Sequence, residues 1–127
     1  MKIHTYLSSS GKDLIMEYIN ALTIEEQVDG LAVLAYMEKG EFEKVLSKRW
    51  DKKVYEVYFR RNNRIFYVTA DRDNIYLLHV CRKQKNKTER VDKNIVLART
   101  RELGRFLGRK IVSEEVIWHL QKLIFKK

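Results

Sequence analysis

Two apolar patterns at helical spacing occupy the first third of the chain, after a short strand expected at residues 2–7. The first pattern predicts a helix over residues 12–22, with the serines at 8–10 as N-cap candidates, and consists of Leu14, Ile15, Tyr18, Ile19 and Leu22. The second predicts a helix from Thr23 to Gly40, with a core-facing stripe at Ile24, Val28, Leu31, Leu34 and Ala35. Thr23 and Glu26 fit a capping box, so these two helices are expected to form a helical hairpin.

After Trp50 the pattern changes to β-branched and aromatic runs. VYEVYF, RIFYVT and NIYLLHV each predict a strand. Turns are expected at Asn62-Asn63 and at 71–74, because Asn and Asp tolerate tight-turn conformations. The runs therefore predict a three-stranded antiparallel meander whose third strand is covered on both faces. Helical hairpin and sheet together indicate an α+β fold, with the hairpin packed on an antiparallel sheet.

The last third predicts two further helices. The first spans residues 89–107, with a broken apolar stripe at Val91, Ile95, Ala98 and Leu103. The second starts at Ser113 and runs to the end of the sequence, with an apolar face at Val116, Ile117, Leu120, Leu123 and Ile124. A chain of 127 residues suggests one domain, 1–127, to which the helix at about 113–127 is an addition.

The first strand of the meander alternates in a way that bears on function. Tyr55, Val57 and Phe59 are expected to pack on the helices, and Glu56, Tyr58 and Arg60 to face solvent. Arg64 has two possible positions. A two-residue turn places it beside Arg61 on the Phe59 face, whereas a three-residue turn places it opposite Arg60 on the Glu56 face.

Charge adds a class of partner to this picture. The chain has 26 Lys and Arg against 17 Asp and Glu, a net charge of +9, which favours nucleic acid or an acidic protein as a partner. Four cations follow the third predicted strand, at Arg82, Lys83, Lys85 and Lys87, and the hairpin tip adds Arg60, Arg61 and Arg64. These cations form either a solvated basic surface or an anion-binding cleft, and we favour the cleft because like charges crowded together need relief.

Other classes of site are disfavoured. The one cysteine, Cys81, lies in an apolar run and is expected to be a buried thiol. Three scattered histidines make a metal site improbable, and we expect no metal and no cofactor. Neither a signal peptide nor an apolar run of membrane-spanning length is recognisable, so we expect a cytoplasmic protein without membrane association.

The order of these motifs resembles the RelE/ParE superfamily of toxins, in particular its HigB-like, phage-related branch. The resemblance rests on Tyr55-Glu56-Val57-Tyr58, on Arg64-Ile65-Phe66-Tyr67 and on Leu77-Leu78-His79-Val80-Cys81-Arg82-Lys83, and it covers roughly residues 1–103. It implies two helices on an antiparallel sheet and a metal-free endoribonuclease, an mRNA interferase of a type II toxin–antitoxin pair that commonly acts on the ribosome. It also implies a cognate antitoxin, expected to be a helix-turn-helix protein with an acidic neutralising segment. Tyr58 stands where the family usually has arginine, and Gln84 where it has a second lysine.

Metal-free RNA cleavage needs a base near the ribose 2′-hydroxyl, cations around the phosphoryl oxygens and a proton donor for the leaving oxygen. Glu56 is the candidate base, Arg64 and Arg60 are candidate phosphate clamps, and Lys83 is a candidate for charge stabilisation or proton transfer. Tyr58 and Tyr67 are candidate stacking platforms for bases. Further RNA contacts are expected at Arg61, Arg82, Lys85 and Lys87.

Each nomination has an alternative. Glu56 can simply pair with Arg60, its neighbour on the same face, and His79 is expected to be a core residue in preference to a catalytic one. Two other functions also remain open. One is a ParE-like toxin that inhibits DNA gyrase, and the other is a non-catalytic nucleic-acid-binding protein whose binding depends strongly on salt.

Overall fold

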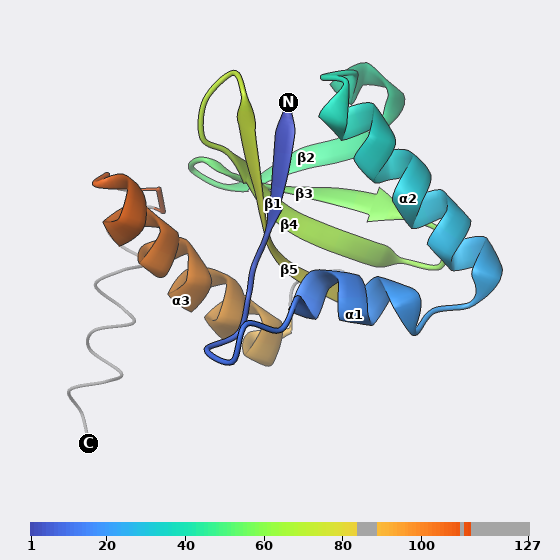
Figure 1. Cartoon of the computed structure of the whole chain (residues 1–127), viewed down its shortest axis with the longest axis horizontal. Helices are drawn as coiled ribbons and strands as arrows, with labels where there is room; N and C mark the ends of the chain where they lie inside the picture. Colours follow the sequence, from blue (N-terminus) through green and yellow to red (C-terminus); the bar gives the residue numbers. More distant parts are fainter. Residues whose placement is uncertain (84–88, 110, 113–127) are drawn as a thin grey trace.

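The computed structural model describes residues 1–83, 89–109 and 111–112, and it is an α+β fold as predicted (Figure 1). Its elements, in chain order, are β1 (Lys2–Thr5), α1 (Leu14–Asn20), α2 (Ile24–Glu38), the 3-10 turn η1 (Phe42–Lys44), β2 (Leu46–Asp51), β3 (Val54–Phe59), β4 (Asn63–Thr69), β5 (Asn74–Arg82) and α3 (Arg90–Leu107). The expected helix after Ser113 lies outside the described residues.

The five strands form one sheet in the order β1-β5-β4-β3-β2. The predicted meander is its centre, since β3, β4 and β5 pair antiparallel in sequence. The sheet is mixed and not entirely antiparallel, because β1 pairs parallel with β5. The sequence prediction missed β2, which is the opposite edge strand and pairs antiparallel with β3. The polar composition of β2 hid it, since only Leu46 and Trp50 of its six residues are apolar and none of the six is buried.

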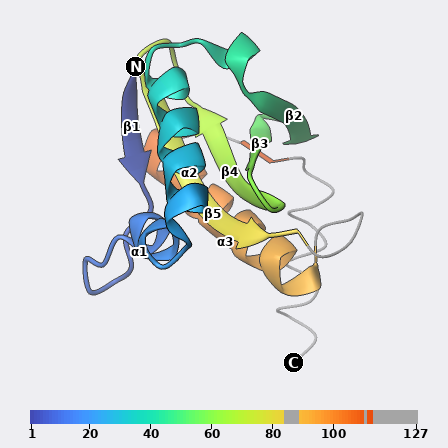
Figure 2. The same ribbon diagram turned by 90° about the vertical axis from the view of Figure 1, so that its right-hand side faces the viewer.

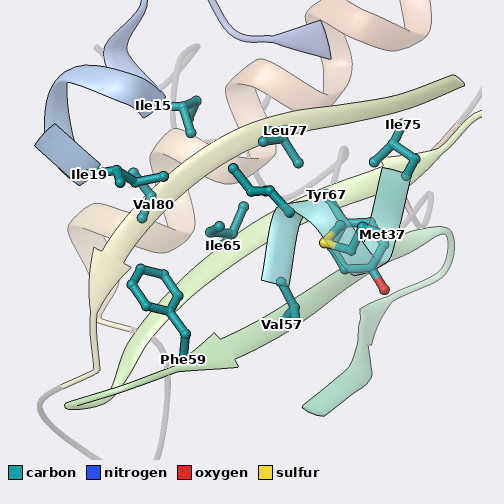
Figure 3. Packing of buried hydrophobic residues seen from close by; sticks show 11 residues of the cluster. Ile15, Ile19, Met37, Val57, Phe59, Ile65, Tyr67, Ile75, Leu77 and Val80 are labelled. Carbon is teal, nitrogen blue, oxygen red and sulfur yellow. The ribbon is translucent and has the colours of Figure 1, made fainter. Parts of the chain in front are cut away.

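Helices cover both faces of the sheet. Helices α1 and α2 lie on one face and α3 lies on the other (Figures 1 and 2). Each side has its own core. Figure 3 shows the α1/α2 side, where Ile15, Ile19 and Met37 from the helices meet Val57 and Leu77 from the strands. The α3 side has a second cluster that includes Phe66, Leu78, Val96 and Leu103.

The helix starts differ in part from the predicted ones. Asp13, not one of the serines, caps α1 by accepting a hydrogen bond from the Met16 backbone at 3.0 Å. Thr23 caps α2 as predicted, and its hydroxyl accepts from the Glu26 backbone at 3.3 Å. The reciprocal half of the capping box does not form. The Glu26 side chain turns instead into the protein, where its side chain is 3% exposed.

Most of the predicted core stripe of α2 was also wrong, although Leu34 is buried as expected. Ile24, Val28 and Leu31 are exposed, and the buried positions of α2 are Glu26, Gly30, Leu34 and Met37. The sequence pattern misled because two core-facing positions are not apolar side chains. One is the glycine, which lets the Phe59 ring approach so closely that a Cβ at Gly30 would lie 3.0 Å from it. The other is the acid Glu26.

Helix α3 has the predicted length but is rotated from the predicted orientation. Its buried residues are Val96, Leu97, Thr100, Leu103 and Gly104. Of the predicted stripe only Leu103 is buried, and Val91 is 71% exposed. The helix ends at Gly108, whose φ of 71° is the left-handed conformation that glycine adopts without strain.

Candidate functional site

Glu56, Tyr58 and Arg64 lie on the α3 side of the sheet. Tyr58 pairs with Arg64 across β3 and β4, and Phe59 pairs with Asn63, so Arg64 belongs to the Glu56 face. The turn between the strands consists of residues 60–62, in which Arg61 and Asn62 both have a φ of 62°. The turn therefore has three residues and places Arg64 on the Glu56 face, as one of the two expected geometries had it. Arg60 lies in the turn and does not pair with Arg64, so that part of the expectation was wrong.

Glu56 and Arg64 form a buried ion pair. The Glu56 Oε2 atom lies 3.1 Å from the Arg64 guanidinium, and the two side chains are 3% and 2% exposed. The expectation that Glu56 faces solvent was wrong. Burial by itself would lower the pKa of Arg64, but its contacts with Cys81 and Glu56 outweigh burial and raise it. The guanidinium also stacks 5.0 Å from the centre of the Phe66 ring.

Three side chains lie above this pair, nearer the surface: Lys48, Tyr58 and Lys83. The Tyr58 hydroxyl donates to Glu56 Oε1 at 2.6 Å. The Lys48 Nζ atom lies 3.4 Å from the same oxygen, and its side chain is 58% exposed. Lys83 donates to the Tyr58 hydroxyl at 3.5 Å. The two ammonium groups also lie 5.5 and 5.3 Å from the centre of the Tyr58 ring, so the phenol is positioned between two cations.

Sequence reasoning missed Lys48. It lies directly opposite Glu56 in the pairing of β2 with β3. Hydrogen bonding to Tyr58 and the nearby charge of Glu56 raise its pKa, which keeps the amine protonated. The position of Lys48 could have been predicted from the sequence. If residues 46–51 form a strand joined to the next one by a turn at Lys52-Lys53, Lys48 comes close to Glu56. Without recognition of that strand, Lys48 is one of many surface lysines.

The structure places three of the predicted arginines elsewhere, at the N-terminus of α2. Arg60 pairs with Glu25 at 2.8 Å and with Asp29 at 3.4 Å, and not with Glu56. Arg82 donates to Glu26 at 2.9 Å, and Arg61 lies 3.8 Å from the same carboxylate.

Glu26 itself is held by a neutral partner as well. The side-chain amide of Asn63 donates to it at 2.9 Å, and this bond, followed by the contact with Arg82, lowers the pKa of Glu26. Asn63 also accepts from the Tyr18 hydroxyl at 2.6 Å. This network holds the hairpin tip and the end of β5 against α2. Arg60, Arg61 and Arg82 therefore stabilise the fold, and their acidic partners neutralise part of their charge.

Tyr67 does not join the site either. It is 3% exposed and lies in the α1/α2 core beside Met37, with its hydroxyl bonded to Ser47 (Figure 3). A base cannot stack on a ring that is enclosed in this way. Lys85 and Lys87, the last two predicted RNA contacts, lie outside the described residues.

A second polar cluster lies beside Arg64. His79 Nε2 and Asp92 Oδ1 are 2.8 Å apart, and burial lowers the pKa of the histidine in spite of this partner. Burial also raises the pKa of the Cys81 thiol to about 11, as expected for a buried cysteine. Potential metal ligands of these three residues lie within 4.8 Å of one another. However, Arg99 contacts His79 at 3.4 Å and Arg64 contacts Cys81, and two adjacent cations oppose the entry of a metal cation.

This arrangement is suited to acid–base chemistry on an anion. The exposed Lys48 and the half-buried Lys83 supply positive charge near the surface, and the Tyr58 phenol connects them to the buried Glu56 carboxylate. Arg64 holds the Glu56 carboxylate in place from the buried side of the site. No other pair of lysines in the described part of the chain shares a tyrosine in this way.

The fold, with a helical hairpin on one face of the sheet and a basic acid–base cluster on the other, is consistent with the RelE-like class. The model of the family described as phage-derived protein Gp49-like matches residues 17–101, and the chain belongs to this family. It is a RelE/ParE-like family of toxins from toxin–antitoxin pairs, so a cognate antitoxin is implied as a partner. A search of curated proteins found no match. None of the helices in the described residues is long and apolar enough to cross a membrane.

Proposed function

We propose that this chain is a metal-free endoribonuclease that cleaves mRNA, on the ribosome as the HigB-like resemblance implies, and so inhibits translation in the cytoplasm. The observation that carries the proposal is the layer of Lys48, Tyr58 and Lys83 above the buried Glu56–Arg64 pair. A gyrase inhibitor requires no such combination of phosphate-binding cations and proton-transfer groups.

In this proposal the two lysines hold the scissile phosphate. The RNA 2′-hydroxyl attacks the phosphorus and gives its proton to the Tyr58 oxygen, as Tyr58 passes its own proton to Glu56. The P–O5′ bond breaks, and Lys83 protonates the departing 5′-oxygen. The products are a 2′,3′-cyclic phosphate and a 5′-hydroxyl. Acid–base assistance of this kind contributes about 10²–10⁴-fold to rate.

Arg64 has a different role here from the phosphate clamp expected from the sequence. Because its side chain is 2% exposed, it acts on the carboxylate and not on RNA. It holds Glu56 in line with Tyr58 and is a positioning residue. Arg60, Arg61 and Arg82 contribute longer-range attraction to RNA, reduced by their acidic partners.

The test is cleavage of mRNA in a purified translation system, with and without ribosomes, and cleavage of free mRNA in a buffer that contains a chelator. The wild type is expected to produce 2′,3′-cyclic phosphate ends, and Tyr58→Phe is expected to lose about 10²-fold or more in rate. Tyr36→Phe, a change of the same kind at a half-exposed tyrosine of α2, is the matched control and is expected to retain full activity. Equal rates for Tyr58→Phe and the wild type contradict the proposal. Binding without cleavage would indicate the nucleic-acid-binding alternative.

A further inference from the structure

The outer face of α2 is exposed to solvent, yet it has apolar residues where polar ones are usual. Ile24, Val28 and Leu31 are 79%, 60% and 49% exposed, and Ala35 continues the same line. Their spacing of four, three and four residues is the spacing of a coiled-coil seam. A contiguous apolar line on the solvent side of a helix indicates a surface that a partner covers, in contrast to single exposed residues such as Val91.

The local charge of α2 argues against nucleic acid as that partner. In a chain of net charge +9, α2 contains four acids, Glu25, Glu26, Asp29 and Glu38, and neither lysine nor arginine. Glu26 is buried, but Glu25 and Asp29 remain 66% and 46% exposed beside the apolar line even while they pair with Arg60. Phosphates would meet these carboxylates, whereas basic side chains of a protein helix would pair with them.

The position of this face separates it from the candidate active site. α2 lies on one side of the sheet, in front of the strands in Figure 2, whereas α3 and the Glu56 face lie on the other side. A partner seated on α2 therefore does not need to enter the active site.

From the apolar seam, its acidic border and the toxin–antitoxin family, we propose that the outer face of α2 seats an amphipathic helix of the antitoxin. The occupant has apolar residues at the same four-three-four spacing and lysine or arginine on the flank that meets Glu25 and Asp29. A second copy of this chain is a poorer occupant, because α2 would then meet its own acidic border. This inference rests on the toxin assignment in the proposed function, but it does not depend on ribonuclease activity.

The test uses two synthetic helical peptides as probes, with leucine at the seam positions and either lysine or glutamate at the flanking positions. Fluorescence anisotropy with the full chain is expected to show binding of the lysine peptide and about tenfold or weaker binding of the glutamate peptide. Val28→Ser/Leu31→Ser is expected to lose about tenfold or more in affinity for the lysine peptide. Val91→Ser on α3 removes an apolar side chain that is 71% exposed, more than Val28 or Leu31, and is expected to bind like the wild type.

Three results would overturn this inference. They are equal binding of both peptides, equal binding by the seam variant, and a wild-type dimer in sedimentation experiments that the seam variant converts to monomers. The third would identify a second copy as the occupant. All three readouts are independent of RNA cleavage, so an inactive enzyme that binds the lysine peptide would leave this inference standing and contradict only the ribonuclease.

Discussion

At the scale of single residues, the chemistry of this protein depends on which charges are buried. Glu56 and Arg64 are almost fully enclosed, whereas Arg60, four residues from each in sequence, is 46% exposed. A buried ion pair is costly to break, because the remaining charge stays desolvated. An exposed pair contributes little, since water and salt screen it. The two arginines should therefore respond very differently to the same substitution.

We expect Arg64→Ala to reduce the free energy of unfolding by about 3–5 kcal/mol, because it leaves the Glu56 carboxylate buried without its guanidinium. Arg60→Ala is the matched control and is expected to cost about 1 kcal/mol or less. Urea unfolding followed by circular dichroism measures both. Similar losses for the two variants would contradict the distinction between buried and exposed pairs. Loss of RNA cleavage in Arg64→Ala is interpretable only in the fraction that remains folded.

Cys81 provides a residue-scale test by pH. Burial disfavours the charged thiolate, and the pKa of the thiol rises from 9.0 to about 11. Only the thiolate reacts with iodoacetamide, so at pH 8 the folded chain should be alkylated about 100-fold more slowly than the chain in urea. The rate for the folded chain should continue to rise with pH up to about 11. A plateau near pH 9 would show that the thiol is not held in an apolar environment.

At the scale of elements, the sequence predicted the presence of helices and strands better than their orientation. The meander from Val54 to Arg82 was predictable because β-branched and aromatic runs end at Asn and Asp turns. The sequence did not show which faces of α2 and α3 point outward. Glycine and polar residues occupy core-facing positions in these helices, at Glu26, Gly30 and Thr100. Such positions depend on neighbours distant in sequence, as Phe59 shows at Gly30. A periodicity analysis cannot include those neighbours.

Helix α3 offers a test of one such position, at Gly104. A Cβ on this residue would lie 2.6 Å from the Arg109 carbonyl oxygen, so the backbone after the helix would have to move. Alanine is intrinsically the better helix residue by about 1 kcal/mol. We nevertheless expect Gly104→Ala to destabilise the chain by about 1–3 kcal/mol, as overpacking does.

Ala98→Gly is the matched control for this substitution, because Ala98 is an exposed position in the same helix. It should cost only the propensity difference of about 1 kcal/mol. Thermal unfolding of both variants measures these changes. A Gly104→Ala variant that is more stable than the wild type would contradict the close approach of Arg109 to α3.

At the scale of the whole molecule, the two faces of the sheet have different tasks in our account. The α3 face holds the candidate ribonuclease site, and the α2 face offers an apolar seam to a protein. Sequence reasoning identified Glu56, Tyr58, Arg64 and Lys83 as candidate residues, and the structure brings these four together. It could not separate them from Arg60, Arg61, Arg82 and Tyr67, because that separation follows from the strand register and from the acids at the start of α2.

The most direct test of the central claim is a map of mRNA 5′ ends in bacteria after induced expression. The wild type is expected to arrest growth and to create new 5′ ends inside translated codons. Lys48→Ala/Lys83→Ala is expected to lose both effects, because it removes the two cations around Tyr58. Lys2→Ala/Lys12→Ala removes the same charge away from the site and should behave like the wild type. New 5′ ends that persist in Lys48→Ala/Lys83→Ala, or growth arrest by the wild type without any new ends, would contradict a ribonuclease site above Glu56.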